Sequence, residues 1–197
     1  MIHIISGLMN SGKTWLMNKY GFFNYIRGKN IYSNQKNLNF PYKFFNADFL
    51  LYIGKEQPSL NNSCFLIDEL WLFVADSRNA MSEANKLLSY MALQSSKDDL
   101  EIYLTSQSFS QNDKRLKQNF HKLSLCSRYL LNPNTKKLEK LNENKRFLTQ
   151  EQQENLYIQE KLYYNQYGNL ILHNTLYHKA INWFWLYDTT EKIRSGV

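Results

Sequence analysis

Eight residues near the amino terminus have the types and the spacing of a phosphate-binding loop. Residues 7–14 read Gly-Leu-Met-Asn-Ser-Gly-Lys-Thr and directly follow a short apolar run, Ile2 to Ile5. Glycines at both ends let the backbone curl so that successive N–H groups point inward at phosphate oxygens, and a following helix adds the positive end of its dipole. The pattern therefore predicts that this loop binds a nucleoside triphosphate.

Two side chains at the end of the loop have the chemistry to act on the bound phosphates. We expect Lys13 to reach the β- and γ-phosphates and the Thr14 hydroxyl to ligate Mg²⁺. The remaining contacts are expected from the loop residues Gly7, Asn10, Ser11 and Gly12. The alternative interpretation is a glycine-containing turn with a chance Lys-Thr pair. The agreement of strand, spacing and helix favours the phosphate-binding loop, with ATP and Mg²⁺ as the ligands.

Two acidic residues follow a second apolar run, Cys64 to Ile67. We expect Asp68 to hold Mg²⁺ through its water shell, and Glu69 to orient or deprotonate an attacking water. The alternative is a buried strand that ends in two solvated acids. A kinase must keep water away from the γ-phosphate and gains little from a water-activating glutamate, so Glu69 favours hydrolysis.

A glutamine follows a third apolar strand, Glu101–Ser106. If this strand lies between the first strand and the strand that ends at Asp68, Gln107 points at the γ-phosphate. There it can sense whether the phosphate is present and bias a mobile element. The alternative is a polar residue at a strand end that faces water, so the position of this strand decides between the two interpretations.

The overall composition indicates one α/β domain with a modest positive charge. The chain has 197 residues, enough to bury a sizeable core. Strands alternate with helices behind the phosphate-binding loop, which implies a mostly parallel sheet flanked by helices. We assign residues 1–131 to the core and residues 132–197 to an addition to the same domain. The net charge of +7 is consistent with a polyanionic partner, and equally with solubility alone.

Local patterns predict further elements along the chain. We expect helices at residues 13–26, 82–97 and 113–120, a short helix from Asp48, strands at 30–34, 122–131 and 180–187, and a turn at 167–169. Thr149 and Gln152 have the spacing of a capping box. The two cysteines, Cys64 and Cys126, lie in apolar runs and are too few for a disulfide scaffold or a zinc site.

The order of these motifs resembles that of the FtsK–HerA superfamily of DNA-pumping ATPases, over about residues 2–131. Two stretches carry the resemblance beyond the common motifs: Ile67-Asp-Glu-Leu-Trp with Asp76-Ser-Arg78, and Thr105-Ser-Gln-Ser-Phe-Ser with Asp113-Lys-Arg-Leu. The compact size is similar to that of genome-packaging ATPases of membrane-containing archaeal and bacterial viruses. The chain also resembles the cytosolic ATPase domain of zonula-occludens-toxin-like proteins, which serve filamentous phage assembly. The resemblance implies a P-loop NTPase core of the additional-strand, RecA-like type.

The same resemblance implies a function and its partners. It implies a homo-oligomer, expected to be a hexamer, that couples ATP hydrolysis to the movement of double-stranded DNA during viral genome packaging. A capsid or portal-vertex protein is a further implied partner, and the cytoplasm of the host cell or the virion is the implied location. No apolar run is long enough for a membrane span, so no integral membrane segment is expected. Three alternatives stay open: a filamentous-virus assembly ATPase, a nucleotide or small-molecule kinase, and a nucleotide-gated scaffold.

One departure from the family pattern concerns the arginine that acts on a neighbouring subunit's nucleotide. Such ATPases carry an arginine just before the glutamine strand, whereas this chain has Gln94-Ser-Ser-Lys97-Asp-Asp there. Lysine lacks the planar fork that suits a transferring phosphoryl group. Arg115 is our first candidate for this catalytic role, with Lys97, Arg78 or no such residue as alternatives. A basic cluster surrounds Arg115 and is equally suited to contact DNA phosphates; it comprises Lys114, Arg115, Lys117, His121 and Lys122.

Overall fold

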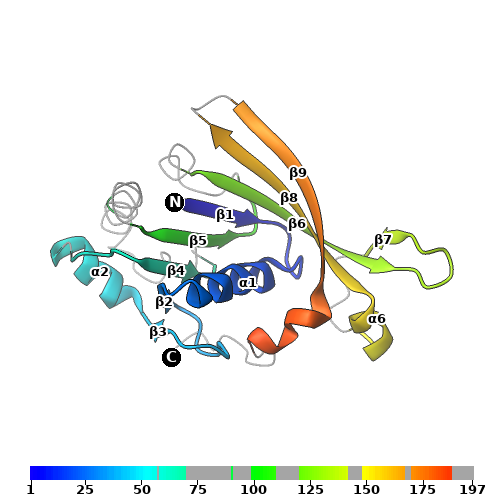
Figure 1. Cartoon of the computed structure of the whole chain (residues 1–197), viewed down its shortest axis with the longest axis horizontal. Coiled ribbons are helices and arrows are strands. Elements are labelled where there is room, and N and C mark those ends of the chain that lie inside the picture. Colours follow the sequence, from blue (N-terminus) through cyan, green and yellow to red (C-terminus); the bar gives the residue numbers. More distant parts are fainter. Residues whose placement is uncertain are drawn as a thin grey trace.

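A mixed β-sheet forms the centre of the computed structural model (Figure 1). The structure describes residues 1–56, 58–69, 90, 99–109, 120–141, 148–166 and 170–187. The described strands are β1 (Ile2–Ser6), β2 (Asn30–Ser33), β3 (Lys43–Phe44), β4 (Ser63–Ile67), β5 (Glu101–Ser106), β6 (Lys122–Leu131), β7 (Leu138–Lys140), β8 (Leu156–Gln166) and β9 (Leu170–Lys179). They lie in the order β3-β2-β4-β5-β1-β6-β8-β9, and β7 pairs with β6.

The amino-terminal part of this sheet is parallel and has the predicted strand order. Strand β5 pairs with β1 on one side and with β4 on the other, both in parallel. Strands β2, β3 and β6 extend the parallel part at its two ends. The expectation of a mostly parallel, additional-strand, RecA-like core is therefore confirmed, and so is the position of the glutamine strand between the other two.

Helices cover both faces of the sheet because successive residues of each strand point to opposite sides. Ile5 packs with the apolar face of α1 (Lys13–Ile26) in one buried cluster. Ile4 belongs to a second cluster with residues of β4 and β5 and with Ile53 of α2 (Ala47–Glu56). Cys64 and Cys126 are both buried and free, as expected for small apolar residues.

Strands β8 and β9 extend the same sheet beyond β6 as an antiparallel hairpin. The short helix α6 (Gln150–Glu154) leads into β8, and Thr149 and Gln152 form the predicted capping box at its start. The division of the chain at residue 131 stays a prediction, since one sheet carries strands from both sides of it. The predicted turn at 167–169 lies outside the described residues.

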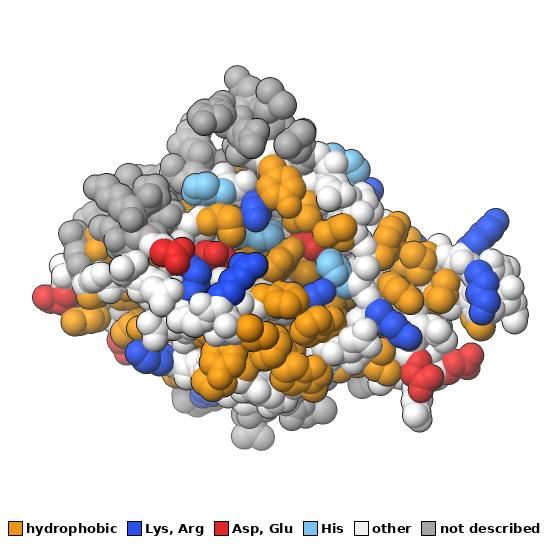
Figure 2. All heavy atoms as spheres, in the orientation of Figure 1, with side chains coloured by type: hydrophobic (Ala, Val, Ile, Leu, Met, Phe, Trp, Pro, Cys, Tyr) orange, Lys and Arg blue, Asp and Glu red, His pale blue; other side chains and the backbone are white. Residues whose placement is uncertain are grey.

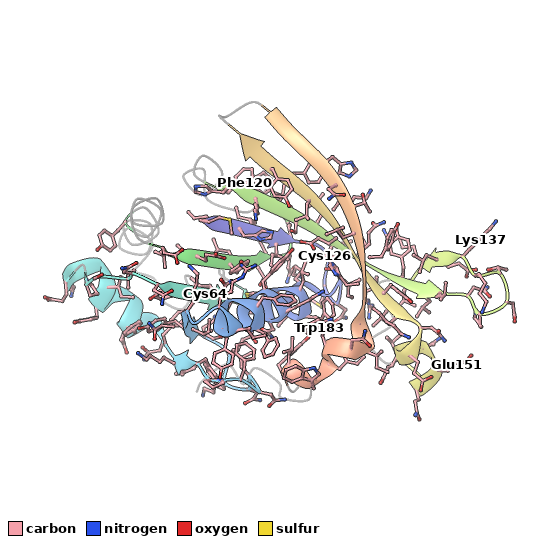
Figure 3. The ribbon with its side chains drawn as sticks, in the orientation of Figure 1. Cys64, Phe120, Cys126, Lys137, Glu151 and Trp183 are labelled. Carbon is pink, nitrogen blue, oxygen red and sulfur yellow. The ribbon has the colours of Figure 1, made fainter. Side chains whose placement is uncertain are left out.

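The prediction of a last strand at residues 180–187 is wrong. Residues Ala180–Leu186 form a 3-10 helix, η2, and Tyr187 alone makes a bridge, to Leu38. A 3-10 helix has three residues per turn, so positions 180, 183 and 186 share one face. Ala180 and Leu186 are fully buried and Trp183 packs against the same core cluster (Figure 3), which is why this apolar run coils over α1 instead of extending.

Hydrophobic side chains also gather on the surface over α1 and η2 (Figure 2). The exposed ones are Phe23, Tyr25 and Ile26 of α1 with Ile181 and Trp185 of η2.

No helix among the described residues is both long and apolar enough to cross a membrane. The predicted helices at 82–97 and 113–120 lie outside the described residues, apart from Tyr90 and Phe120.

A buried polar network ties α1 to the carboxy-terminal hairpin. The Glu160 side chain on β8 is fully buried and accepts hydrogen bonds from Tyr20 (2.7 Å), Ser124 (2.6 Å) and His178 (2.9 Å). The other ring nitrogen of His178 lies 2.9 Å from the Lys19 ammonium. Burial raises the pKa of Glu160, but the three hydrogen bonds outweigh it and hold the pKa below its usual value. The helix that begins at the phosphate-binding loop is thereby fixed to β8 and β9.

His3 completes this network on β1, and its replacement by phenylalanine is expected to flatten the loss of stability below neutral pH. Burial lowers the pKa of His3 to about 4, against a partial opposing effect of Glu160. An unfolded histidine titrates near about 6.5. The stability that neutral, buried His3 contributes to the free energy of unfolding is therefore fully present above about pH 6.5. It is lost as the pH falls toward about 4, at about 1.4 kcal/mol per pH unit. Chemical denaturation across this pH range measures the slope.

The phenylalanine variant keeps the ring contacts of His3 with Tyr20 and Tyr103, at centroid distances of 5.1 and 5.4 Å. It loses the 2.6 Å hydrogen bond to Ser124, so a lower stability at neutral pH is expected as well. Burial also lowers the pKa of His121. His121 is present in the wild type and in the His3 variant, so its effect on the pH slope cancels when the two are compared. His173→Phe, at an exposed position of β9, is the control. An unchanged pH slope in the His3 variant contradicts the prediction.

Candidate functional site

The phosphate-binding loop joins the carboxyl end of β1 to the start of α1, as the motif requires. Asn10 and Gly12 adopt left-handed backbone conformations, with φ of 60° and 93°. The loop is closed by a hydrogen bond from the Ser11 N–H to the Leu8 carbonyl (3.1 Å). The Lys13 ammonium donates to the same carbonyl (2.9 Å), so its charge lies across the loop.

The packing shows why positions 7 and 12 of this loop must be glycine. A side-chain Cβ at position 7 would lie 2.5 Å from the Ser11 hydroxyl and 2.8 Å from the carbonyl of Cys126, whose residue is labelled in Figure 3. At position 12, a Cβ would lie 2.5 Å from Ile158, and the positive φ of Gly12 excludes most other residues as well. The loop is thus packed directly onto β6 and β8.

The structure brings the second motif against the first. Thr14 donates to both carboxylate oxygens of Asp68, at 3.1 Å each. This contact joins the first turn of α1 to the end of β4. A hydroxyl and a carboxylate placed together are hard oxygen donors of the kind that Mg²⁺ prefers.

The negative charges of Glu69 and Asp68 act on the ammonium group of Lys13. Lys13 is only 5% exposed. Burial lowers its pKa, and the negative charges of Glu69 and Asp68 oppose this shift. Burial also raises the pKa of Asp68, which is countered by its hydrogen bonds from Thr105 and Thr14. The lysine and the two acids therefore interact electrostatically within one site.

Gln107 directly follows the end of β5, next to the start of the loop. Ser6 and Ser106 are register partners, and the Gly7 N–H donates to the Ser106 carbonyl (3.2 Å). The predicted position of Gln107 at this edge of the sheet is therefore observed, whereas its role as a phosphate sensor stays a prediction. Arg115, Lys97 and Arg78 lie outside the described residues, so the choice among them is unchanged.

The basic cluster around Arg115 is described only at its carboxyl end. The N–H of Ile2 donates to His121 (3.1 Å), so this ring helps to hold β1. The Lys122 ammonium lies 5.3 Å from the centre of the Tyr164 ring. These two residues therefore have contacts within the fold, and their binding to DNA stays a prediction.

Two residues that sequence reasoning missed hold the acids in place. Asn34, just after β2, makes two hydrogen bonds to the backbone of Asp68, at 2.8 and 2.9 Å. Thr105 on β5 donates to the Asp68 carboxylate (2.6 Å) and accepts from the Glu69 N–H (2.8 Å). Both are polar residues at carboxyl ends of parallel strands, which is the same signal that identified Gln107.

The arrangement fits a triphosphate with a divalent cation. The Ser11 hydroxyl is buried in the loop and, among the described residues, has no hydrogen-bond partner. Such an orphaned group in a glycine-rich loop is suited to a phosphate oxygen. Thr14 and Asp68 would hold the cation, and Lys13 would face the phosphates.

Comparisons with known proteins support the fold and leave the function open. No family model matches the sequence, and no curated protein matches it. The N-terminal domain of zonular occludens toxin from Neisseria meningitidis superposes with a TM-score of 0.58 and 15% identity, covering 95% of this chain and 98% of that one. The genome packaging NTPase B204 from Sulfolobus turreted icosahedral virus 2, solved in complex with AMPPCP, has a TM-score of 0.49 and 12% identity, covering 90% and 96%. The resemblance to zonula-occludens-toxin-like ATPases is therefore confirmed at the level of the fold, along nearly the whole chain.

Proposed function

We propose that the chain is an ATP-hydrolysing motor that moves double-stranded DNA, in the setting of viral genome packaging. The observation that supports the ATP-hydrolysing site is the contact of Thr14 with Asp68, next to Lys13 and Glu69, at the end of a sheet with β5 between β1 and β4. The DNA-moving role rests on the resemblance of the motif order to that of DNA-pumping ATPases. The proposed assembly is a homo-oligomer, with a hexamer as the expected form. A capsid or portal-vertex protein and the host cytoplasm or virion are the proposed partner and location.

Each residue of the site has a distinct part in the proposed hydrolysis. The loop backbone and the Ser11 hydroxyl bind and orient the phosphates, and Lys13 neutralises charge on the β- and γ-oxygens. Glu69 orients the attacking water and accepts its proton. When bound by Thr14 and Asp68, Mg²⁺ supplies further charge neutralisation at the phosphates. Gln107, which directly follows β5, senses the γ-phosphate in this proposal.

A second candidate is the assembly ATPase of a filamentous virus. The match to the zonular occludens toxin domain, over 95% of this chain, favours it as a specific alternative. Both candidates need the same hydrolytic site, and they differ in the substrate on which the motor acts. If an oligomer hydrolyses ATP at a rate that double-stranded DNA does not change, the assembly ATPase is favoured over the packaging motor.

The test is the rate of ATP hydrolysis with and without double-stranded DNA, together with the oligomer mass of the same sample. We expect magnesium-dependent turnover, stimulated several-fold by DNA, from a particle that contains several copies of the chain. Lys13→Ala removes the cation at the phosphates and is expected to abolish turnover, which excludes a contaminating ATPase. DNA-independent turnover by a monomer that phosphorylates a small metabolite overturns the proposal in favour of a kinase.

A further inference from the structure

The hydroxyl group of Thr105, on the neighbouring strand, holds the turn that carries the two acids. Thr105 is fully buried near the end of β5. Its hydroxyl lies 2.6 Å from a carboxylate oxygen of Asp68 and 2.8 Å from the backbone nitrogen of Glu69. A hydroxyl has one proton to donate, and that proton goes to the carboxylate, while a lone pair accepts the N–H. One group therefore contacts both acidic residues.

The backbone at Glu69 needs such a support. Glu69 has a φ of 50°, in the left-handed region that residues with a Cβ rarely adopt. Strained backbone of this kind persists where surrounding contacts over-determine it, and it occurs preferentially at functional sites. The hydrogen bond from the Glu69 N–H to Thr105 holds the residue at the point where the strain is located.

The opposite side of the same turn is fixed by a different type of contact. Asn34 pairs with the N–H and the carbonyl of Asp68, and so extends the β2–β4 pairing by one side chain. Both of these hydrogen bonds go to the backbone of the first acid. Thr105, by contrast, hydrogen-bonds both to the Asp68 carboxylate and to the Glu69 backbone.

The strand that provides this hydroxyl also provides Gln107 and adjoins the phosphate-binding loop. Position 105 lies two residues before Gln107, and the next carbonyl, of Ser106, accepts from the Gly7 N–H (3.2 Å). The Glu69 backbone is therefore connected to the end of β5 through the Thr105 hydroxyl. We propose that Thr105 is a positioning residue, which holds Asp68 and Glu69 in their working geometry and links them to the end of β5. This inference rests on the proposed function.

The test compares variants that separate the hydroxyl from the shape of the side chain. Thr105→Val keeps the shape and removes the hydroxyl, and Thr105→Ser keeps the hydroxyl and removes a methyl group. We expect the valine variant to lose about tenfold or more in kcat, with KM for ATP changed by less than about threefold, and serine to restore most of kcat. Ser63→Ala removes another buried hydroxyl, at the amino end of β4, and is the control.

A merely structural role of Thr105 does not produce this pattern. Equal kcat in the valine variant and the wild type overturns the inference, and so does a serine variant as impaired as valine. If the valine variant fails to fold, Thr105→Ala takes its place in the same comparison.

A second measurement does not depend on turnover. Hydrogen exchange of the Glu69 amide, followed by NMR, is expected to accelerate at least about tenfold in the valine variant and to stay near the wild-type rate with serine. If the exchange rate of the Glu69 amide is unchanged in the valine variant, the inference is overturned, whether or not the protein hydrolyses ATP. Absence of wild-type turnover, by contrast, counts against the proposed function alone.

Discussion

Replacing Glu69 with glutamine is expected to lower ATP hydrolysis by about a hundredfold or more while nucleotide binding stays intact. The amide has nearly the size and shape of the carboxylate but cannot accept the proton of the attacking water. Binding is expected to persist because Lys13, Thr14 and the loop are unchanged. The variant also removes the Glu69 charge, which opposes the lowering of the Lys13 pKa. The phosphates then no longer compete with that carboxylate for the lysine. Phosphate release and the affinity for a fluorescent ATP analogue measure the two effects separately.

The control for this experiment is an acid of the same type outside the site. Glu139→Gln changes an exposed residue of β7, which accepts a hydrogen bond from Asn132 (2.9 Å), and it should hydrolyse ATP at the wild-type rate. Hydrolysis by the Glu69 variant at that same rate contradicts the assignment of the water-activating residue. A nucleotide-gated scaffold, in which hydrolysis has no part, predicts this contrary result.

The strands that hold the phosphate-binding site could be predicted because each is a short run of buried apolar residues. Ile2–Ser6, Ser63–Ile67 and Glu101–Ser106 are buried at nearly every position, as interior strands of a parallel sheet must be. Their order was implied only by the resemblance to additional-strand, RecA-like ATPases, and the expected role of Gln107 was conditional on it. The observed order places the polar residues that follow these strands at one edge of the sheet.

The last apolar run was misinterpreted because its composition is equally suited to a strand. Residues 180–187 are rich in aromatic side chains and include the β-branched Ile181, and such residues favour strands. Their burial has a period of three instead of two, since Ala180 and Leu186 are buried and Trp183 packs on the same cluster. What decides the outcome is the surface of α1, where Phe23 meets Trp183 at a centroid distance of 5.3 Å. A long-range contact of this kind is not encoded in local periodicity.

Thr105 and Asn34 were missed for a related reason. Thr105 was visible in the sequence as part of the glutamine strand, but a strand residue gives no sign of which neighbour it contacts. The register of β4 against β5 pairs Ile67 with Leu104 and so brings Thr105 level with Asp68. Only this register shows that the hydroxyl meets both acids. The chemistry at the ends of strands is thus predictable by residue type, while its partners follow from the pairing.

Glu160→Gln is expected to lower the free energy of unfolding by about 2–4 kcal/mol, because a buried charged network then loses its acceptor. If the amide oxygen accepts from Tyr20 and Ser124, the NH₂ group faces the Nε2–H of His178. The two donors cease to oppose each other only if the His178 proton moves to Nδ1. That nitrogen lies 2.9 Å from the Lys19 ammonium, which can only donate. If the amide is turned, the hydroxyls of Tyr20 and Ser124 lose their acceptor instead.

Neither orientation satisfies all the buried donors, and the charge that opposes the lowered pKa of Lys19 is lost as well. Chemical denaturation at neutral pH measures the loss, with Glu139→Gln as the exposed control. Because the network joins α1 to β8 and β9 and does not touch the acids at residues 68 and 69, the ATP turnover of the folded fraction should stay near the wild-type value. A loss of stability no larger than that of the control contradicts the network's role in holding the loop-bearing helix to the hairpin.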